Sequence, residues 1–172
     1  MNRINQIINE ILLDYFPVLN ISEDKFSNME SKFVELESLL KEAFQAIPTL
    51  EIKKHTQTGG RASIPWIGFR LIDGTLDSKP QTGVYLTILF KADGSGVVLS
   101  LQHGVDKLKS SEIPLKIKDL RNLIPDYPEF IKGKLNLKTE ILKSPSRPKK
   151  YEIANLIGKD YDYNNIKEIT SD

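Results

Sequence analysis

The sequence predicts an α+β domain in which N-terminal helices pack on a mixed or antiparallel β-sheet with a central hairpin. Three observations carry this prediction: helical spacing of apolar residues before Pro48, alternating spacing after it, and a turn-rich tetrapeptide between two apolar runs near residue 94. The 172 residues, 40% of them hydrophobic, suit one compact domain. We expect residues 1–48 to form a helical segment and residues 49–172 to form the region with the sheet.

Two segments place apolar side chains on one stripe of a helix. The first stripe ends before Pro17, and the second has Ser27 or Asn28 as candidate caps and Pro48 as its stop. The stripes are Ile4, Ile7, Ile8, Ile11, Leu12 and Tyr15, then Phe33, Leu36, Leu40, Ala43, Phe44 and Ile47. Residues 1–50 carry four Lys or Arg against eight Asp or Glu. Because acidic outer faces repel phosphates, we expect these helices to be structural.

The remaining elements follow from alternation and from turn residues. A strand begins at residues 50–54, is broken by Gly59 and Gly60, and is followed by a strand at 64–72 and a turn-rich stretch at 73–82. The runs 83–91 and 97–102 flank Asp93-Gly94-Ser95-Gly96, the strongest hairpin signal in the chain. Further on, we expect a short helix at 115–124, strands at 135–142 and 151–157, and a loop at 144–148.

Composition excludes several classes of function. The chain has no cysteine, which rules out disulfides, thiolate nucleophiles, iron–sulfur clusters and the common zinc fingers, and which fits a reducing compartment. No apolar run approaches the roughly 18 residues needed to cross a bilayer. We therefore expect a cytoplasmic protein that has no membrane partner.

No arrangement of residues typical of catalysis stands out. His55 and His103 lack the spacing of a metal-binding pair, and the glycine pairs lack the spacing of a phosphate-binding loop. A nuclease hypothesis rests only on the scattered acids Glu152, Asp160 and Asp162, which we interpret as surface residues. We expect a binding domain without catalysis, cofactor or metal.

Aromatic residues in the sheet region precede or adjoin a basic segment. Trp66 and Tyr85 lie in predicted strands, and Tyr151 directly follows Lys149 and Lys150. Residues 107–150 carry twelve Lys or Arg against five Asp or Glu. Bases stack on aromatic rings and phosphates pair with cations, so the combination suits nucleic acid. Each aromatic residue taken alone also fits an ordinary core position.

Residues 59–104 carry a family resemblance. The block Gly59-Gly60-Arg61-Ala62-Ser63-Ile64-Pro65-Trp66, followed by 83–90 and 98–104, resembles the N-terminal DNA-binding domain of the McrB modification-dependent (type IV) restriction family. The segment 147–152 is similar to the closing segment of that domain. The resemblance spans most of residues 50–165, so it implies that 49–172 is a DNA-binding region.

The resemblance implies that the domain flips a methylated cytosine out of the duplex into an aromatic pocket. By residue-level transfer that pocket is lined by Trp66, Tyr85, Leu89 and Tyr151. The expected DNA-contacting residues are Thr58, Gly59, Gly60, Arg61, Ser63, Lys107, Lys109, Arg147, Lys149 and Lys150. In the family's best-known member an aromatic wedge precedes the first glycine, whereas this chain has Thr58, which cannot fill a base-sized gap. The alternatives are that Gln57 or Arg61 holds the duplex open in place of an aromatic wedge, or that the protein engages DNA differently.

The resulting hypothesis is a module that recognises modified cytosine in double-stranded DNA and targets a restriction complex. Its implied partners are the duplex and a motor or nuclease domain or subunit, since those activities reside elsewhere in such systems. The alternative is a protein-interaction module of a restriction or regulatory assembly, favoured by the acidic helices and the net charge of +1.

Overall fold

The computed structural model describes residues 2–14, 22–57, 61–74, 76–109, 111–143 and 145–163. Two helices, α1 (Arg3–Asp14) and α2 (Glu23–Ala43), come first. The strands are β1 (Leu50–Gln57), β2 (Arg61–Leu71), β3 (Val84–Phe90), β4 (Gly96–His103) and β5 (Asn155–Asp162). Between β4 and β5 lie α3 (Ile113–Asn122), the 3₁₀ turn η2 (Thr139–Ile141) and α4 (Ser146–Ala154).

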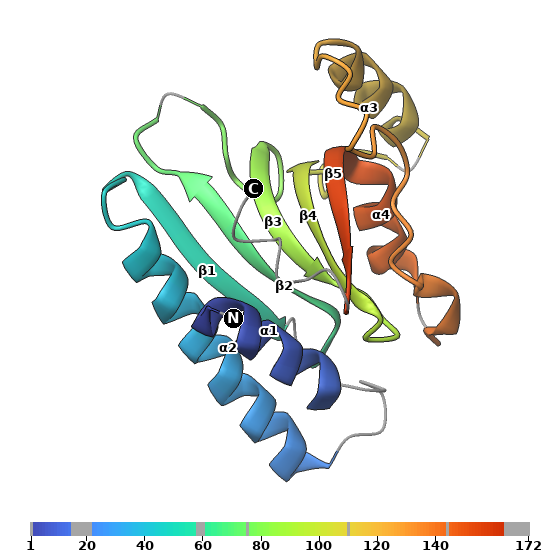
Figure 1. Ribbon diagram of the computed structural model, residues 1–172. Coiled ribbons are helices and arrows are strands. Elements are labelled where there is room, and N and C mark those ends of the chain that lie inside the picture. The colour runs from blue at the N-terminus through green and yellow to red at the C-terminus, as the bar shows by residue number, and fades with distance from the viewer. Residues whose placement is uncertain are drawn as a thin grey trace.

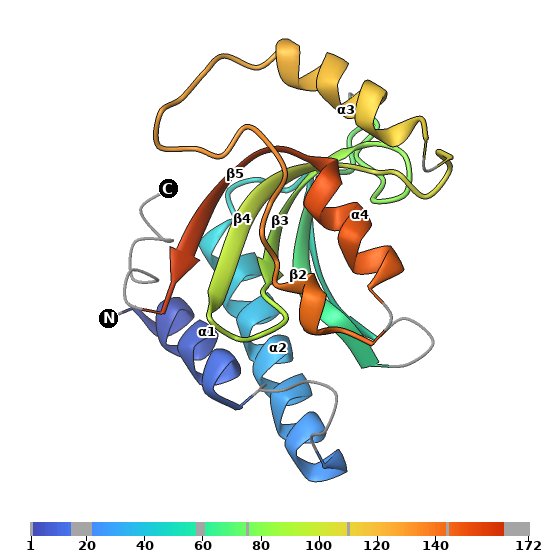
Figure 2. The same ribbon diagram turned by 90° about the vertical axis from the view of Figure 1, so that its right-hand side faces the viewer.

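The five strands form one antiparallel sheet in the order β1-β2-β3-β4-β5. The α+β prediction and the central hairpin are thereby confirmed, with β3 paired to β4 from Val84 opposite His103 to Phe90 opposite Val97. Figures 1 and 2 show α1 and α2 side by side against one face of the sheet and α4 against the opposite face. We call these the α1/α2 face and the α4 face.

Alternation along the strands divides the core between these two faces. Ile67, Ile88 and Val97 pack with the apolar stripes of α1 and α2. Their sequence neighbours Trp66, Leu89 and Val98 point the other way and pack beneath the segment that includes Leu135 and Leu137. The predicted stripe residues Ile7, Ile8, Ile11, Leu12, Phe33, Leu36 and Leu40 are buried, and Tyr15 lies outside the described residues. The end of the second stripe was wrong, because α2 ends at Ala43, and Ala43, Phe44 and Ile47 are exposed.

The second helix begins earlier than the sequence predicted. Ser22, rather than Ser27 or Asn28, is its N-cap, and the Ser22 hydroxyl accepts a hydrogen bond from the Lys25 N–H. Glu23 and Asp24 then occupy the first turn, where negative charge is favourable near the unpaired backbone N–H groups. Ser27 and Asn28 lie inside the helix, so their prediction as caps was wrong.

The predicted strand at 135–142 was wrong. Leu135 and Leu137 do alternate with polar residues, but their backbone N–H groups bond Glu152 instead of a neighbouring strand. Leu135 donates to the Glu152 carbonyl at 3.0 Å and Leu137 to its carboxylate at 3.1 Å. The segment is thus an extended cover over the α4 face, and Thr139–Ile141 form a 3₁₀ turn.

Residues 144–148 and 151–157 also differ from the prediction. A helix, α4, runs from Ser146 to Ala154, where a loop and the first part of a strand were predicted; residue 144 of that loop lies outside the described residues. Strand β5 begins at Asn155, so the predicted strand is confirmed only for residues 155–157. Pro148 does not prevent the helix, because it lies in the first turn, where backbone N–H groups have no intrahelical partner. This helix presents Tyr151 toward the sheet from the opposite side to α1 and α2.

Candidate nucleic-acid interface

Trp66 lies on the α4 face at a place where the sheet has no side chain beneath its ring. Gly68 is two residues along β2, and a Cβ on Gly68 would lie 2.5 Å from Cζ3 of the indole. The glycine therefore lets the indole lean along the strand. On the neighbouring strand, the His55 imidazole stacks on Trp66, with ring centroids 3.7 Å apart and planes inclined by 13°.

Tyr85 reaches the same place from β3. Its ring centroid lies 5.7 Å from that of Trp66 at an interplanar angle of 40°. The side chain is buried, and this burial raises the pKa of the Tyr85 hydroxyl above its ordinary value, so the group is a neutral phenol at physiological pH. A neutral phenol can both donate and accept a hydrogen bond.

Tyr151 approaches from α4 and is half-buried. Burial raises the pKa of its hydroxyl, while hydrogen bonding to Arg147 and to Trp66 opposes that shift. A hydrogen bond of 3.1 Å from Gln102 Nε2 of β4 to the Tyr151 carbonyl oxygen holds α4 against the sheet at this position. Arg147 also forms an ion pair with Asp106, with 3.5 Å between a guanidinium nitrogen and a carboxylate oxygen.

These three aromatic side chains line one cavity of about 110 Å³, which we call the aromatic cavity. Leu89 belongs to the same buried cluster and pairs with Trp66 across β2 and β3, but it lies behind the cavity wall, 1% exposed. The lining comprises His55, Trp66, Pro80, Gln81, Tyr85, His103, Val105, Asp106, Arg147, Tyr151 and Ala154. The structure thus brings three of the four predicted pocket residues to one concave site.

Two further cavities adjoin the aromatic cavity. One of about 220 Å³, the α4 cavity, shares Trp66, Arg147 and Tyr151 with it and adds Arg61 and Ser63. The other, of about 180 Å³, is the edge cavity, and it shares His55, Pro80, Gln81 and Tyr85. The shared lining residues place the three cavities side by side on the α4 face, and we call the three cavities together the groove.

The segment 77–83 closes one side of this groove with Pro80 and Gln81. It is held close to β4 by two backbone hydrogen bonds, from Gly104 N–H to the Gly83 oxygen at 2.7 Å and from Asp106 N–H to the Gln81 oxygen at 3.2 Å. A Cβ on Gly104 would fall on the backbone of Gln81 and Thr82. Glycine at this position is therefore required by close packing of two backbones.

The predicted DNA-contacting cations occupy two different environments. Lys107, Lys109 and Lys149 are exposed, and Lys150 is partly exposed. Arg61, in contrast, pairs with Glu23 of α2, and its guanidinium lies 4.5 Å from the centre of the Phe26 ring. Thr58, Gly59 and Gly60 lie outside the described residues.

Sequence reasoning missed His55, Gln81 and Asp106. All three line the aromatic cavity, and none belongs to the Pro-Trp block or to a basic run. The local signal for His55 was its alternation with buried Ile52 and Thr56 along β1, which assigns it to the α4 face. Nothing local pointed to Gln81, because its position depends on contacts with Gly104 and Asp106, more than twenty residues away.

The described part of the chain offers no metal centre: no group of three or more His, Cys, Asp or Glu side chains is placed to hold an ion there. Of the acids that suggested a nuclease, Glu152 was wrongly interpreted as a surface residue: it is buried and accepts hydrogen bonds from Leu137 N–H and the Thr139 hydroxyl. Asp160 pairs with Lys91 at 2.6 Å. Among the same described residues, no helix has the length and apolar character that a membrane crossing requires.

Comparison with known proteins agrees with the resemblance in the Pro-Trp block. A family model, the MrcB-like N-terminal domain, matches residues 19–171. Comparisons with curated proteins and with solved structures produced no match. Since the matched residues span α2, the whole sheet and α4, the chain belongs to the family of MrcB-like N-terminal domains.

Proposed function

We propose that this domain binds double-stranded DNA and recognises a modified cytosine, flipped out of the helix, in the aromatic cavity. The observation that carries the proposal is the convergence of Trp66, Tyr85 and Tyr151 from three separate elements on one cavity. Family membership supports it, because the same three residues are those that the resemblance to the McrB family implied.

A pyrimidine enters this cavity only if lining side chains move. The cavity of about 110 Å³ is smaller than the roughly 150 Å³ cavity known to admit benzene. His55, His103 and Tyr151 are the aromatic lining residues that are not fully buried, and His55 and Tyr151 also line the edge cavity and the α4 cavity, respectively. A base that replaces His55 on the indole face exchanges one stacked ring for another, which keeps the cost of opening low.

Energetics set the expected selectivity. Extruding a base costs a few kcal/mol, and stacking on aromatic side chains returns roughly 1–3 kcal/mol per base. A single methyl group is worth about 1–3 kcal/mol in a tight pocket, or roughly 10- to 200-fold discrimination. Phosphate contacts from exposed cations such as Lys149 must supply most of the affinity, so binding should weaken steeply with salt.

The direct test measures binding to otherwise identical duplexes that carry cytosine, 5-methylcytosine, 5-hydroxymethylcytosine, N4-methylcytosine or N6-methyladenine. We expect wild type to prefer a modified cytosine, and Trp66→Ala and Tyr151→Ala to lose the preference while keeping salt-dependent affinity. Because truncating a buried tryptophan costs about 3–5 kcal/mol of stability, folding of Trp66→Ala must be checked by circular dichroism.

Tyr127→Ala is the matched control, since Tyr127 is 50% exposed and lies outside all three cavities. It should bind as wild type does. Equal affinity of wild type, Trp66→Ala and Tyr151→Ala for the methylated duplex would refute the proposal. Binding that lacked any salt dependence would instead favour a protein-interaction module.

A further inference from the structure

Most polar side chains around the aromatic cavity can both donate and accept a hydrogen bond. They are the amide of Gln81, the phenols of Tyr85 and Tyr151, and the imidazoles of His55 and His103. Burial lowers the pKa of both histidines, to about 4 for His55, so both rings are neutral at physiological pH. Asp106 and Arg147 differ, because a carboxylate only accepts and a guanidinium only donates.

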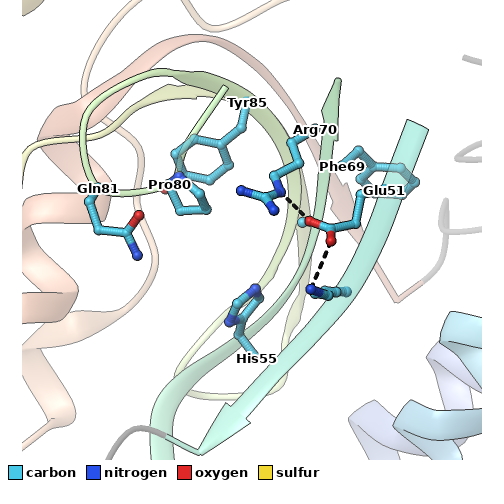
Figure 3. A pocket seen from close by; sticks show the side chains of 9 residues that line it. Glu51, His55, Phe69, Arg70, Pro80, Gln81 and Tyr85 are labelled. Atoms are coloured by element: carbon cyan, nitrogen blue, oxygen red, sulfur yellow. Dashed lines mark hydrogen bonds and ion pairs between the residues drawn. The ribbon is translucent and has the colours of Figure 1, made fainter. Parts of the chain in front are cut away.

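Asp106 follows the end of β4 and is held in place by the 77–83 segment. Its N–H donates to the Gln81 oxygen at 3.2 Å, and Figure 3 shows Pro80 of that segment beside the Tyr85 ring. Burial raises the pKa of the Tyr85 and Tyr151 hydroxyls, and the negative charge of Asp106 raises both further. The carboxylate therefore lies within electrostatic range of two of the three aromatic walls.

Glu51 and Asp106 are the two carboxylates that line the groove in the described part of the chain, and they differ in how firmly they are held. Glu51, in the edge cavity, pairs with Arg70, as Figure 3 shows, and with Lys53 at 2.7 Å. Hydrogen bonds from these two cations lower the pKa of Glu51 to about 2. Its acceptor capacity is thus already used by its own neighbours.

The contact of Asp106 with Arg147 is looser. The two charged groups are 3.5 Å apart, longer than the roughly 2.7–2.9 Å of a charge-assisted hydrogen bond. The side chains of Arg147 and Asp106 are 52% and 40% exposed, and ion pairs this exposed contribute little to stability. A ligand in the aromatic cavity can therefore replace Arg147 at the carboxylate at little cost.

An acceptor at this place bears on a difficulty that the aromatic walls leave open. Thymine carries the same 5-methyl group as 5-methylcytosine, and stacking on Trp66 does not separate the two bases. They differ at position 4, where cytosine has an amino donor and thymine a carbonyl acceptor. Groups that both donate and accept adapt to either base, whereas a carboxylate matches only the amino group.

We propose that Asp106 is a specificity-determining residue, which accepts a hydrogen bond from the 4-amino group of the flipped base and thereby excludes thymine. This inference rests on the proposed function. Thymine in the cavity would place its carbonyl oxygen against the carboxylate and leave both acceptors unpaired, which a hydrogen-bonding site penalises strongly. Such rejection matters because ordinary thymines greatly outnumber modified cytosines as competing sites in DNA.

The experiment compares two otherwise identical duplexes, one with 5-methylcytosine opposite guanine and one with thymine opposite guanine. The methyl group and the opposing base are the same in both. Affinities of wild type and Asp106→Asn are measured for each duplex, and the ratio of the two affinities is compared between the proteins. The cost of extruding each base belongs to the duplex and cancels in this comparison.

We expect the preference for 5-methylcytosine over thymine to fall at least roughly tenfold in Asp106→Asn, the usual worth of a hydrogen bond to a charged group. An asparagine amide can donate to the thymine carbonyl as well as accept from the cytosine amino group. Removing one negative charge strengthens attraction to the phosphates of both duplexes alike, so it leaves the ratio unchanged.

Asp126→Asn is the matched control. Asp126 also forms an ion pair, with Lys132 at 2.7 Å, but it lies outside all three cavities. This variant should keep the wild-type ratio. A ratio in Asp106→Asn within about twofold of the wild-type value overturns the role of Asp106. An equal fall in Asp126→Asn overturns it as well, because charge alone would then explain the effect.

A third duplex, with unmodified cytosine opposite guanine, separates this inference from the function on which it rests. If wild type prefers the methylated duplex to the unmodified one while Asp106→Asn keeps the wild-type ratio, only the role of Asp106 is overturned. If wild type shows no preference for the methylated duplex over the unmodified one, the proposed function is overturned together with this inference.

Discussion

Trp66 and Gly68 show how one residue without a side chain shapes the site. The indole leans over Gly68 at a distance that leaves no room for a methyl group, with Cζ3 only 2.5 Å from a hypothetical Cβ. An alanine at this position must therefore move the indole, because real Cβ contacts are longer. The stack with His55 and the shape of the aromatic cavity depend on this position.

We predict that Gly68→Ala shifts the fluorescence emission of Trp66, the single tryptophan, and weakens binding of a modified duplex at least tenfold. Gly133→Ala is the matched control, since a Cβ there meets nothing within 4 Å. Its emission and binding should equal those of wild type. An unchanged emission spectrum in Gly68→Ala would show that the indole does not depend on the glycine.

His55 makes stability depend on pH in a defined direction. Its pKa is about 4 in the folded protein, chiefly because of burial, against 6.5 for an exposed histidine. Between these values the unfolded chain binds a proton that the folded chain does not. The free energy of unfolding should therefore fall as pH decreases from about 6.5 toward 4, and this contribution of His55 is fully present above pH 6.5.

His55→Phe keeps a ring on Trp66 but does not titrate. In urea unfolding at pH 7 and pH 5, wild type should lose more stability than His55→Phe between the two pH values. His103, whose pKa is also lowered by burial, acts in the same direction, and the difference between the two proteins removes its contribution. Equal losses in both proteins would contradict the assignment of a neutral, stacked His55.

At the residue scale, sequence patterns located Trp66, Tyr85 and Tyr151 but not His55. Trp66 and Tyr85 lie in strands whose alternation is visible in the local sequence. The position of His55 next to Trp66 depends instead on how β1 pairs with β2. Gln57 pairs with Arg61, and an uninterrupted ladder from that pair would place His55 opposite Ser63. The register shift between His55 and Gln57 pairs it with Trp66 instead, and no local pattern encodes that shift.

At the scale of elements, Glu152 fastens the extended segment near residue 137 to α4. Its carboxylate is buried, accepts hydrogen bonds from Leu137 N–H and the Thr139 hydroxyl, and pairs with Lys134 at 3.2 Å. These bonds replace the strand pairing that the sequence predicted for 135–142. The same helix carries Tyr151 and Arg147, so the anchor also positions one wall of the site.

We predict that Glu152→Ala lowers the free energy of unfolding by roughly 1–3 kcal/mol, because it leaves buried donors without an acceptor. Glu152→Gln should lose less, since an amide oxygen can still accept from Leu137 N–H. Chemical denaturation measures both. A loss in Glu152→Gln equal to that in Glu152→Ala would mean that charge, rather than hydrogen bonding, holds the segment.

The elements that sequence patterns identified are those with local periodicity or turn signals: α1, α2, the strands β1 to β4 and the short helix α3. The errors cluster after residue 134, where structure depends on distant partners. Leu135 and Leu137 alternate as a strand would but bond to Glu152, and Pro148 signals a loop but lies in the first turn of a helix. In both places a tertiary contact decided between two locally acceptable conformations.

Over the whole molecule, the two faces of the sheet have different roles. The α1/α2 face is buried under the acidic helices, and the α4 face carries the three adjacent cavities, with Lys107 and Lys149 exposed on the segments around them. This division places exposed positive charge on the side of the aromatic cavity, as the proposed contact with DNA phosphates requires. Sequence composition indicated the charge asymmetry, but the antiparallel sheet was needed to bring Tyr151 to Trp66.

The most direct test of base recognition uses Trp66 as its own probe. Fluorescence is measured as the domain is saturated, at low salt, with a methylated duplex or with an unmodified duplex of the same sequence. A base stacked in the aromatic cavity must change the indole's environment, so only the methylated duplex should strongly quench its emission. The same emission change at saturation with both duplexes would contradict the proposal that a modified base enters the cavity.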